Sequence, residues 1–205
     1  NPKIDVLSII LSTFGFGGFL YGFSVAGSAG WGSTEVIVSF IVGGITLTWF
    51  ILRQLKLKEP ILEFRVMKYK MFTLTTVIGM VTFIAMIGAA IVLPLYMQNM
   101  LGFSPLLSGL VLLPGAIFQG IMNPITGRLF DKYGARWLSI IGLSLIVITT
   151  FMFTVLTDET TFTYIAIVHA FRMVGIAMVL MPVTTAGLNV LPMKLIPHGT
   201  AVNNT

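Results

Sequence analysis

Six long apolar segments are the feature that most constrains the fold of this chain. Each contains about the 20 apolar residues that an α-helix needs to cross the hydrocarbon core of a bilayer. They lie at residues 6–26, 35–52, 72–97, 106–130, 137–156 and 162–191. A closed β-barrel also satisfies its backbone in lipid, but its strands alternate apolar and polar residues. Because the run at 138–148 is continuously apolar, the sequence predicts an all-α, polytopic membrane bundle of six transmembrane helices.

Composition supports the same conclusion. Hydrophobic residues make up 56% of the 205 residues and charged residues only 9%, whereas soluble domains are about a quarter charged. So few charges cannot cover a soluble surface, which excludes a cytosolic, fibrous or disordered protein. The absence of cysteine excludes disulfides and cysteine-ligated zinc. We therefore expect the lipid bilayer, and no nucleic acid, as the partner of most of the surface.

The basic residues predict the orientation. Eleven of the twelve Lys and Arg residues fall in alternate connections between the apolar segments, and the other connections have none. These eleven are Lys3, Arg53, Lys56, Lys58, Arg65, Lys68, Lys70, Arg128, Lys132, Arg136 and Lys194. By the positive-inside rule, both ends of the chain are expected on the cytoplasmic side of the membrane.

The charged segment 53–70 divides the chain. We predict a two-helix hairpin at 1–58, a basic cytoplasmic loop at 59–71, and a four-helix block at 72–205. The hairpin is rich in glycine, which permits close helix approach. The chain begins without Met, at Asn1-Pro2-Lys3, so we expect it to be an internal piece of a longer polypeptide.

One short turn carries the most specific string of the chain, Gly127-Arg128-Leu129-Phe130-Asp131-Lys132-Tyr133-Gly134-Ala135-Arg136. Gly127 and Gly134 allow a tight turn. Asp131 can pair with Arg128 or Arg136 in one helix packing and release them in another, which would make a gate. The alternative is a basic turn, including Lys132, that only fixes topology.

This string resembles the loop motif of the major facilitator superfamily, which joins the second and third helices of a six-helix repeat. The segment beginning Arg172-Met173-Val174-Gly175 resembles the motif of the fourth helix in such a repeat. Four further segments resemble the fourteen-span drug:proton antiporter branch. They are Pro94-Leu95-Tyr96-Met97-Gln98 followed by Leu101-Gly102-Phe103-Ser104-Pro105, then Leu113-Pro114-Gly115, and Asn123-Pro124-Ile125-Thr126-Gly127.

The resemblance implies a fold and a function. The chain would form spans seven to twelve of fourteen, with the hairpin as the two extra helices and the amino-terminal six-helix half missing. It would belong to a plasma-membrane transporter that exports lipophilic drugs by alternating access. The energy source would be the proton gradient, with no bound cofactor. Transport of another small metabolite, or a non-transporting membrane subunit, remains the alternative.

Arg172, the twelfth basic residue, lies inside the sixth predicted helix, away from the connections. A charge at mid-membrane costs ~2.5–3.5 kcal/mol on insertion scales, so it should face a polar cavity or a partner. It either acts in the substrate or proton pathway or bonds carbonyl groups at a helix contact. His169 lies on the same helical face and is either a titrating group or a packing residue. Because no carboxylate lies within the four motif-bearing helices, a coupling acid is expected from the missing half.

Other polar and helix-bending residues have two interpretations each. Gln98, Gln119 and Asn123 either line the pathway or make interhelical hydrogen bonds. Residues expected to kink helices or to pack them closely are Pro94, Pro114, Gly115, Pro124, Gly175 and Pro182.

The sequence lacks the residues that two other classes of membrane protein, intramembrane enzymes and channels, need for their function. An intramembrane enzyme needs a metal site or a paired nucleophile and base, but His169 and His198 fall at different depths. A channel needs a ring or filter of repeated polar groups, and the sequence has none. We therefore predict neither an enzyme nor a metal site.

Overall fold

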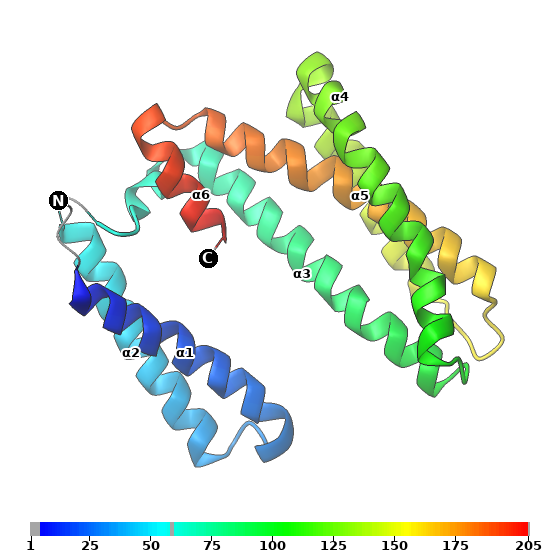
Figure 1. The fold of residues 1–205 in the computed structure, drawn as a ribbon, viewed down its shortest axis with the longest axis horizontal. Coiled ribbons are helices and arrows are strands. Elements are labelled where there is room, and N and C mark those ends of the chain that lie inside the picture. The colour runs from blue at the N-terminus through cyan, green and yellow to red at the C-terminus, as the bar shows by residue number, and fades with distance from the viewer. Residues whose placement is uncertain (1–4, 58–59, 205) are drawn as a thin grey trace. The chain divides into compact units, whose positions relative to one another are not determined.

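The computed structural model describes residues 5–57 and 60–204, and these form helices joined by short connections (Figure 1). Lys3, Lys58 and the predicted boundary at 58/59 lie outside the described residues. The elements in order are α1 (Val6–Ala29), α2 (Thr34–Lys56), η1 (Phe64–Lys68), α3 (Lys70–Asn99), α4 (Pro105–Phe153), α5 (Phe162–Asn189), η2 (Met193–Leu195) and α6 (Ile196–Asn204). Five of these helices, α1 to α5, are long and apolar enough to cross a membrane. The all-α membrane bundle is confirmed.

Helix α4 contains two of the six predicted spans. Its 49 residues would extend roughly 75 Å as one straight helix, more than twice the hydrocarbon core of about 30 Å. Gly134 interrupts it with φ 76° and ψ 172°, a conformation that is essentially restricted to glycine. Figure 1 shows α4 reversing its direction near its label. The segments 105–133 and 135–153 therefore correspond to the predicted spans 106–130 and 137–156.

The chain forms two compact units. One comprises residues 1–67 with 193–205 and is called here the hairpin unit; the other, residues 68–192, is called the α3–α5 unit. The predicted division at 1–58, 59–71 and 72–205 stays a prediction.

Glycines bring α1 and α2 together in the hairpin unit. A Cβ atom added to Gly18 would lie 2.9 Å from the carbonyl oxygen of Ser39 and 3.0 Å from the Cα of Gly43. Such contacts are closer than side chains tolerate, so the two backbones touch where glycine permits it. Leu11 and Phe50 bury their side chains with Leu62 at one end of this pair.

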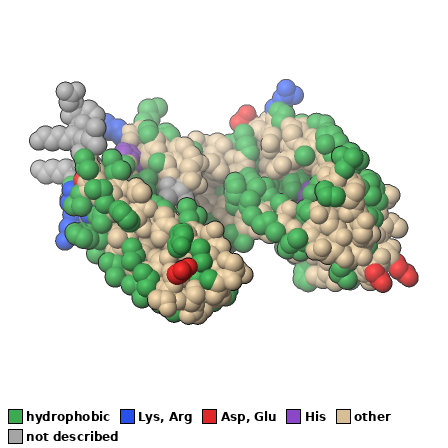
Figure 2. Space-filling model, turned by 60° about the horizontal axis from the view of Figure 1, so that its bottom comes forward, with side chains coloured by type: hydrophobic (Ala, Val, Ile, Leu, Met, Phe, Trp, Pro, Cys, Tyr) green, Lys and Arg blue, Asp and Glu red, His purple; other side chains and the backbone are tan. Residues whose placement is uncertain are grey.

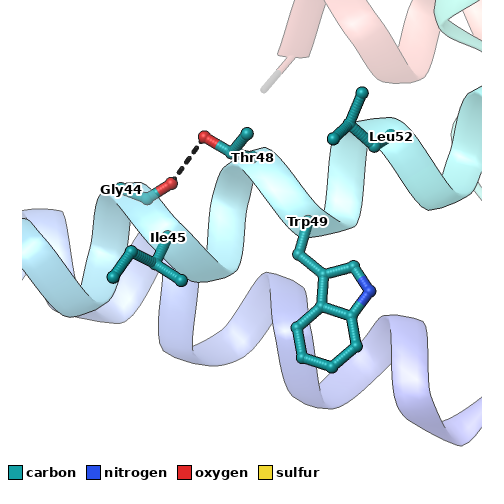
Figure 3. A pocket seen from close by; sticks show the side chains of 5 residues that line it. All are labelled: Gly44, Ile45, Thr48, Trp49 and Leu52. Carbon is teal, nitrogen blue, oxygen red and sulfur yellow. Dashed lines mark hydrogen bonds between the residues drawn. The ribbon is translucent and has the colours of Figure 1, made fainter.

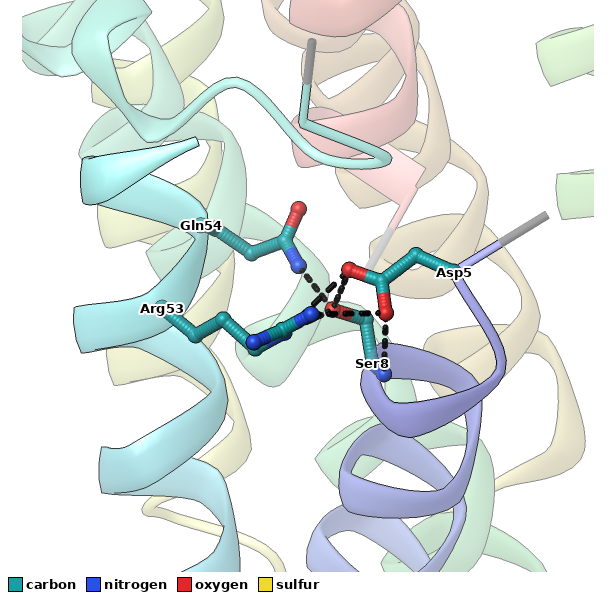
Figure 4. Close-up of polar contacts among 4 residues, drawn as sticks. All are labelled: Asp5, Ser8, Arg53 and Gln54. Carbon is teal, nitrogen blue, oxygen red and sulfur yellow. Dashed lines mark hydrogen bonds and ion pairs between the residues drawn. The ribbon is translucent and has the colours of Figure 1, made fainter. Parts of the chain in front are cut away.

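A polar cluster closes the same end of the hairpin (Figure 4). Arg53 donates to both carboxylate oxygens of Asp5, at 3.0 and 3.2 Å. The buried Gln54 donates to Ser8 Oγ at 2.7 Å and accepts from the backbone N–H of Leu62 at 3.2 Å. The hydrogen bond from Arg53, followed by that from Ser8, lowers the pKa of Asp5 to about 2. The cluster therefore ties the start of α1, the end of α2 and the following connection together.

Helix α5 is the centre of the α3–α5 unit. Fifteen of its 28 residues are buried, whereas α3 buries five of 30, because α5 packs against both α3 and α4. Gly142 of α4 and Gly175 of α5 meet at a close crossing. Figure 2 shows hydrophobic side chains spread over the visible face of each unit, with charged side chains mainly at the ends. Such exposed apolar surface is typical of helices that contact the lipid bilayer.

Candidate functional site

Arg172 occupies the interior of the α3–α5 unit, with only 3% of its surface exposed. One terminal nitrogen, Nη1, donates to Thr150 Oγ1 of α4 at 2.5 Å, and Nη2 donates to the carbonyl oxygen of Ala85 in α3 at 2.9 Å. Its Cζ lies 6.0 Å from the centroid of the Phe153 ring. A single guanidinium therefore links all three helices of the unit.

The partners of Arg172 are neutral. A guanidinium has five N–H donors and no acceptor, and it does not release its proton in proteins. The ion pairs of the described residues are Asp5–Arg53 and Glu63–Arg65, so no described carboxylate balances this charge. Arg172 Nε is buried without a partner among the described residues. The site can therefore hold a fixed positive charge and offer a hydrogen bond, but Arg172 itself cannot carry a proton.

His169 lies one turn before Arg172 and is equally buried, at 3% exposed. Its ring fits against Gly115 of α4, where an added Cβ would lie 2.5 Å from His169 Cδ2 and 2.9 Å from Nε2. His169 Nδ1 has no hydrogen-bond partner among the described residues. The missing side chain of Gly115 thus makes room for the only imidazole in the interior of this unit.

The predicted gating residues surround the reversal in α4. Gly127 is half-buried; the other five, Arg128, Asp131, Lys132, Gly134 and Arg136, are exposed. Lys132 Nζ lies 5.1 Å from the centroid of the Tyr133 ring. Asp131 takes part in neither of the ion pairs found in the described part of the chain, so the gate stays a prediction.

The remaining predicted residues divide between the interior and the surface. The structure brings Arg172, His169, Gly115 and Gly175 into the contact between α4 and α5. Gln98, Asn123 and Pro124 are exposed, and Gln119 and Pro114 are half-buried. The helices continue through all four prolines, which are Pro94 in α3, Pro114 and Pro124 in α4, and Pro182 in α5.

Sequence reasoning missed both hydrogen-bond acceptors of Arg172. Thr150 is one of many threonines in apolar helices, and Ala85 contributes only its backbone. Neither residue type marks a polar site, and they lie 22 and 87 positions from Arg172. Among the residues 5–57 and 60–204, no three His, Asp or Glu side chains gather to form a metal site.

Comparison with known proteins gives the family. The chain matches the model of the Major Facilitator Superfamily over residues 3–205. Over its whole length it is 53% identical to the uncharacterized MFS-type transporter YcnB of Bacillus subtilis (strain 168), covering 43% of that protein. It is 50% identical to the lincomycin resistance protein LmrB of Listeria monocytogenes (strain EGD-e), again over its whole length and covering 44% of that protein.

The lincomycin resistance protein LmrB of Bacillus subtilis (strain 168) is similar at 48% identity, with 100% of this chain and 43% of that protein covered. The chain thus spans less than half the length of these relatives. The family match includes the turn around Gly134 and the buried Arg172, on which the resemblance rested. The chain is an integral membrane protein that belongs to the major facilitator superfamily.

Proposed function

We propose that this chain is part of a transporter that exports lipophilic drugs from the cell. The observation that carries the proposal is the identity of about half, over the entire chain, with proteins named for lincomycin resistance. Export lowers the internal concentration of a drug, which is a direct route to resistance. The apolar helices that span the membrane supply the scaffold for such transport.

The chain is proposed to form spans seven to twelve of a fourteen-span protein of the drug:proton antiporter branch. Six spans are about 43% of fourteen, and the chain covers 43% of YcnB. In a twelve-span protein six spans would be half. This agreement supports a longer polypeptide in which an amino-terminal six-helix half completes the transporter.

The proposed mechanism is alternating access, in which two six-helix bundles rock around a site near the midplane. Both ends of this chain face the cytoplasm, and the proton gradient across the plasma membrane drives export. Arg172 supplies a fixed positive charge beside the pathway, which lowers the proton affinity of a nearby acid from the other half. His169 is the second candidate group in the pathway.

Drug uptake into everted vesicles tests this proposal, because the cytoplasmic face of the membrane points outward there and cellular export becomes uptake. Full-length protein is compared with Arg172→Ala and Arg172→Lys, using lincomycin and a lipophilic dye, with and without a proton uncoupler. We expect the uncoupler to abolish export. We also expect Arg172→Ala to reduce it at least tenfold, with partial rescue by Arg172→Lys because the charge is kept.

Three outcomes would contradict particular parts of the proposal. Export that persists with the uncoupler would exclude proton coupling. Full export by Arg172→Ala would make Arg172 a packing residue. If neither compound moves, the drug-export proposal fails, and transport of another metabolite becomes the better hypothesis.

The proposed gate predicts a separate effect at Asp131. Asp131→Asn should lower the export rate several-fold, because the neutral amide cannot alternate between ion pairs with Arg128 and Arg136. Membrane insertion should be unchanged, since the side chain is exposed. Asp158→Asn, at an exposed acid in the opposite connection, is the matched control. Normal export by Asp131→Asn, measured at equal protein amount, would contradict the proposed gate.

A further inference from the structure

The outward face of α2 carries a groove of about 470 Å³ lined by Gly44, Ile45, Thr48, Trp49 and Leu52 (Figure 3). Residues four apart on a helix form ridges, and two such ridges border this groove. One runs through Gly44, Thr48 and Leu52, and the other through Ile45 and Trp49. In Figure 3 these two rows of side chains project to different sides of the helix. The groove therefore follows the direction of α2.

The groove is apolar and open. Ile45, Trp49 and Leu52 are 62%, 55% and 54% exposed, respectively. Gly44 has no atom within 4 Å of the position of a Cβ. Thr48 Oγ1 donates to the carbonyl oxygen of Gly44 at 2.7 Å, so its hydroxyl is satisfied within the helix. Trp49 adds one indole N–H donor, and the side chains of Ile45 and Leu52 are apolar, so most of the lining suits a hydrocarbon chain.

Both ridges end at a basic residue in the last turn of α2. The ridge of Gly44 continues to Lys56, and the ridge of Ile45 continues to Arg53. Arg53 is paired with Asp5 at 3.0 Å. Lys56 is exposed and makes no ion pair with any described residue. Among the described residues, the end of the groove at Lys56 therefore carries a positive charge without a carboxylate partner.

The length of this arrangement fits one leaflet of a bilayer. Twelve residues separate Gly44 from Lys56, which corresponds to about 18 Å along a helix. Half of the hydrocarbon core is about 15 Å thick. An acyl chain beside Gly44–Leu52 would therefore place its head group at the level of Lys56.

The geometry points to a binding site for an anionic phospholipid on α2, with its acyl chain in the groove and its phosphate beside Lys56. A zwitterionic lipid fits the groove and offers the same phosphate, but its own positive charge weakens the net attraction to Lys56. A second copy of the chain fits less well, because a symmetric dimer about an axis along the membrane normal would bring two Lys56 side chains to the same depth. The site goes beyond drug export. It depends on the proposed orientation in one respect, which is the leaflet that holds the lipid. That orientation places the site in the cytoplasmic leaflet, which carries anionic lipids.

Quenching of Trp49 fluorescence by brominated lipids tests this site directly. A full-length variant in which every tryptophan except Trp49 is replaced, including Trp31 and Trp137, is placed in phosphatidylcholine vesicles. The vesicles contain a small fraction of brominated phosphatidylglycerol or brominated phosphatidylcholine. We expect phosphatidylglycerol to quench at about fivefold lower concentration. Lys56→Gln should remove most of this preference, since a basic residue near the surface contributes about fivefold, or ~1 kcal/mol. Gly44→Leu should reduce quenching by both lipids.

Two matched variants control for general effects. Lys194→Gln removes another exposed basic residue, and Gly88→Leu adds a side chain at a similarly open glycine of α3; neither should change the quenching. Equal quenching by the two lipids would contradict the proposed site. So would a loss of the preference for phosphatidylglycerol that is as large in Lys194→Gln as in Lys56→Gln. Absence of quenching by either lipid would also overturn the site, because a protein helix would then cover the groove. The readout does not involve transport, so it stands if drug export fails.

Discussion

Arg172 is held in the membrane interior by oxygens that carry no charge. The Thr150 hydroxyl and the Ala85 carbonyl accept from its two terminal nitrogens. Such hydrogen bonds to an ion are stronger than neutral ones. They offset part of the free-energy cost of removing the guanidinium from water. Without such hydrogen bonds, this cost would exclude the guanidinium from a buried position. The positive charge is therefore a built part of the α3–α5 unit.

Thr150→Val should destabilise the protein because it removes an acceptor from a buried ion. We expect a loss of about 1–2 kcal/mol in the free energy of unfolding, within the range for hydrogen bonds to charged groups and between membrane helices. Denaturant unfolding of the full-length protein in detergent measures it. Thr150→Ser keeps the hydroxyl and should retain most of this stability. Unchanged stability of Thr150→Val, together with a loss in Thr150→Ser, would show that the methyl group, and not the hydroxyl, matters.

Asp5 predicts a pH dependence of the hairpin unit. Hydrogen bonds from Arg53 and Ser8 lower its pKa from 3.8 to about 2, so the folded state favours the ionised carboxylate. This contribution is fully present above about pH 3.8 and is lost as the pH falls toward about 2. Asp5→Asn should therefore unfold at a lower temperature than wild type at pH 7, and the difference should shrink below pH 3.8. A difference that stays constant from pH 7 to pH 2 would contradict the role of this pair.

At this scale the sequence predicts isolated charges better than their partners. Arg172 stands out because one charged residue interrupts a long apolar run. Thr150 and Ala85 do not stand out, because their role depends on a packing that brings distant residues together. The same holds for His169, whose neighbour Gly115 was predicted only as a packing or kink residue.

Among the elements, hydropathy locates the helices but not their ends. The predicted run 35–52 becomes the helix Thr34–Lys56, and the run 72–97 becomes Lys70–Asn99. Helical hydrogen bonding continues into the polar residues at the membrane surface, which a hydropathy window excludes. The run 106–130 ends just before Gly134, where backbone conformation and not apolar content stops the helix.

The crossing of α4 and α5 depends on the lack of a side chain at Gly142. A Cβ there would lie 2.7 Å from both the carbonyl oxygen of Gly175 and Val179 Cγ2. Gly142→Ala should destabilise the protein by about 1–3 kcal/mol through overpacking, although alanine is the better helix former. Gly88→Ala, at an open position of α3, should be neutral or slightly stabilising. Thermal unfolding of both variants gives the comparison, and equal midpoints would contradict a tight crossing.

For the whole molecule, the charges of the connections and the number of membrane spans between them must predict the same side of the membrane for each connection. In the α3–α5 unit, Arg128, Lys132 and Arg136 surround the reversal of α4, whereas Asp158 and Glu159 lie in the connection between α4 and α5. The segment between these positions is one membrane span, so they must lie on opposite sides of the bilayer. By the positive-inside rule, the basic side is predicted to face the cytoplasm.

Cysteine labelling tests this topology, because the chain has no cysteine of its own. Single cysteines replace Lys68 and Lys132 on the predicted cytoplasmic side, and Gly32 and Asp158 on the other side, in a full-length background without other cysteines. A maleimide that cannot cross membranes should label Gly32→Cys and Asp158→Cys in intact cells. It should label the other two only after the membrane is opened, since all four positions are exposed on the protein itself. Labelling of Gly32→Cys without Asp158→Cys would require an odd number of spans between them. That result would contradict the reversal at Gly134 as a membrane turn.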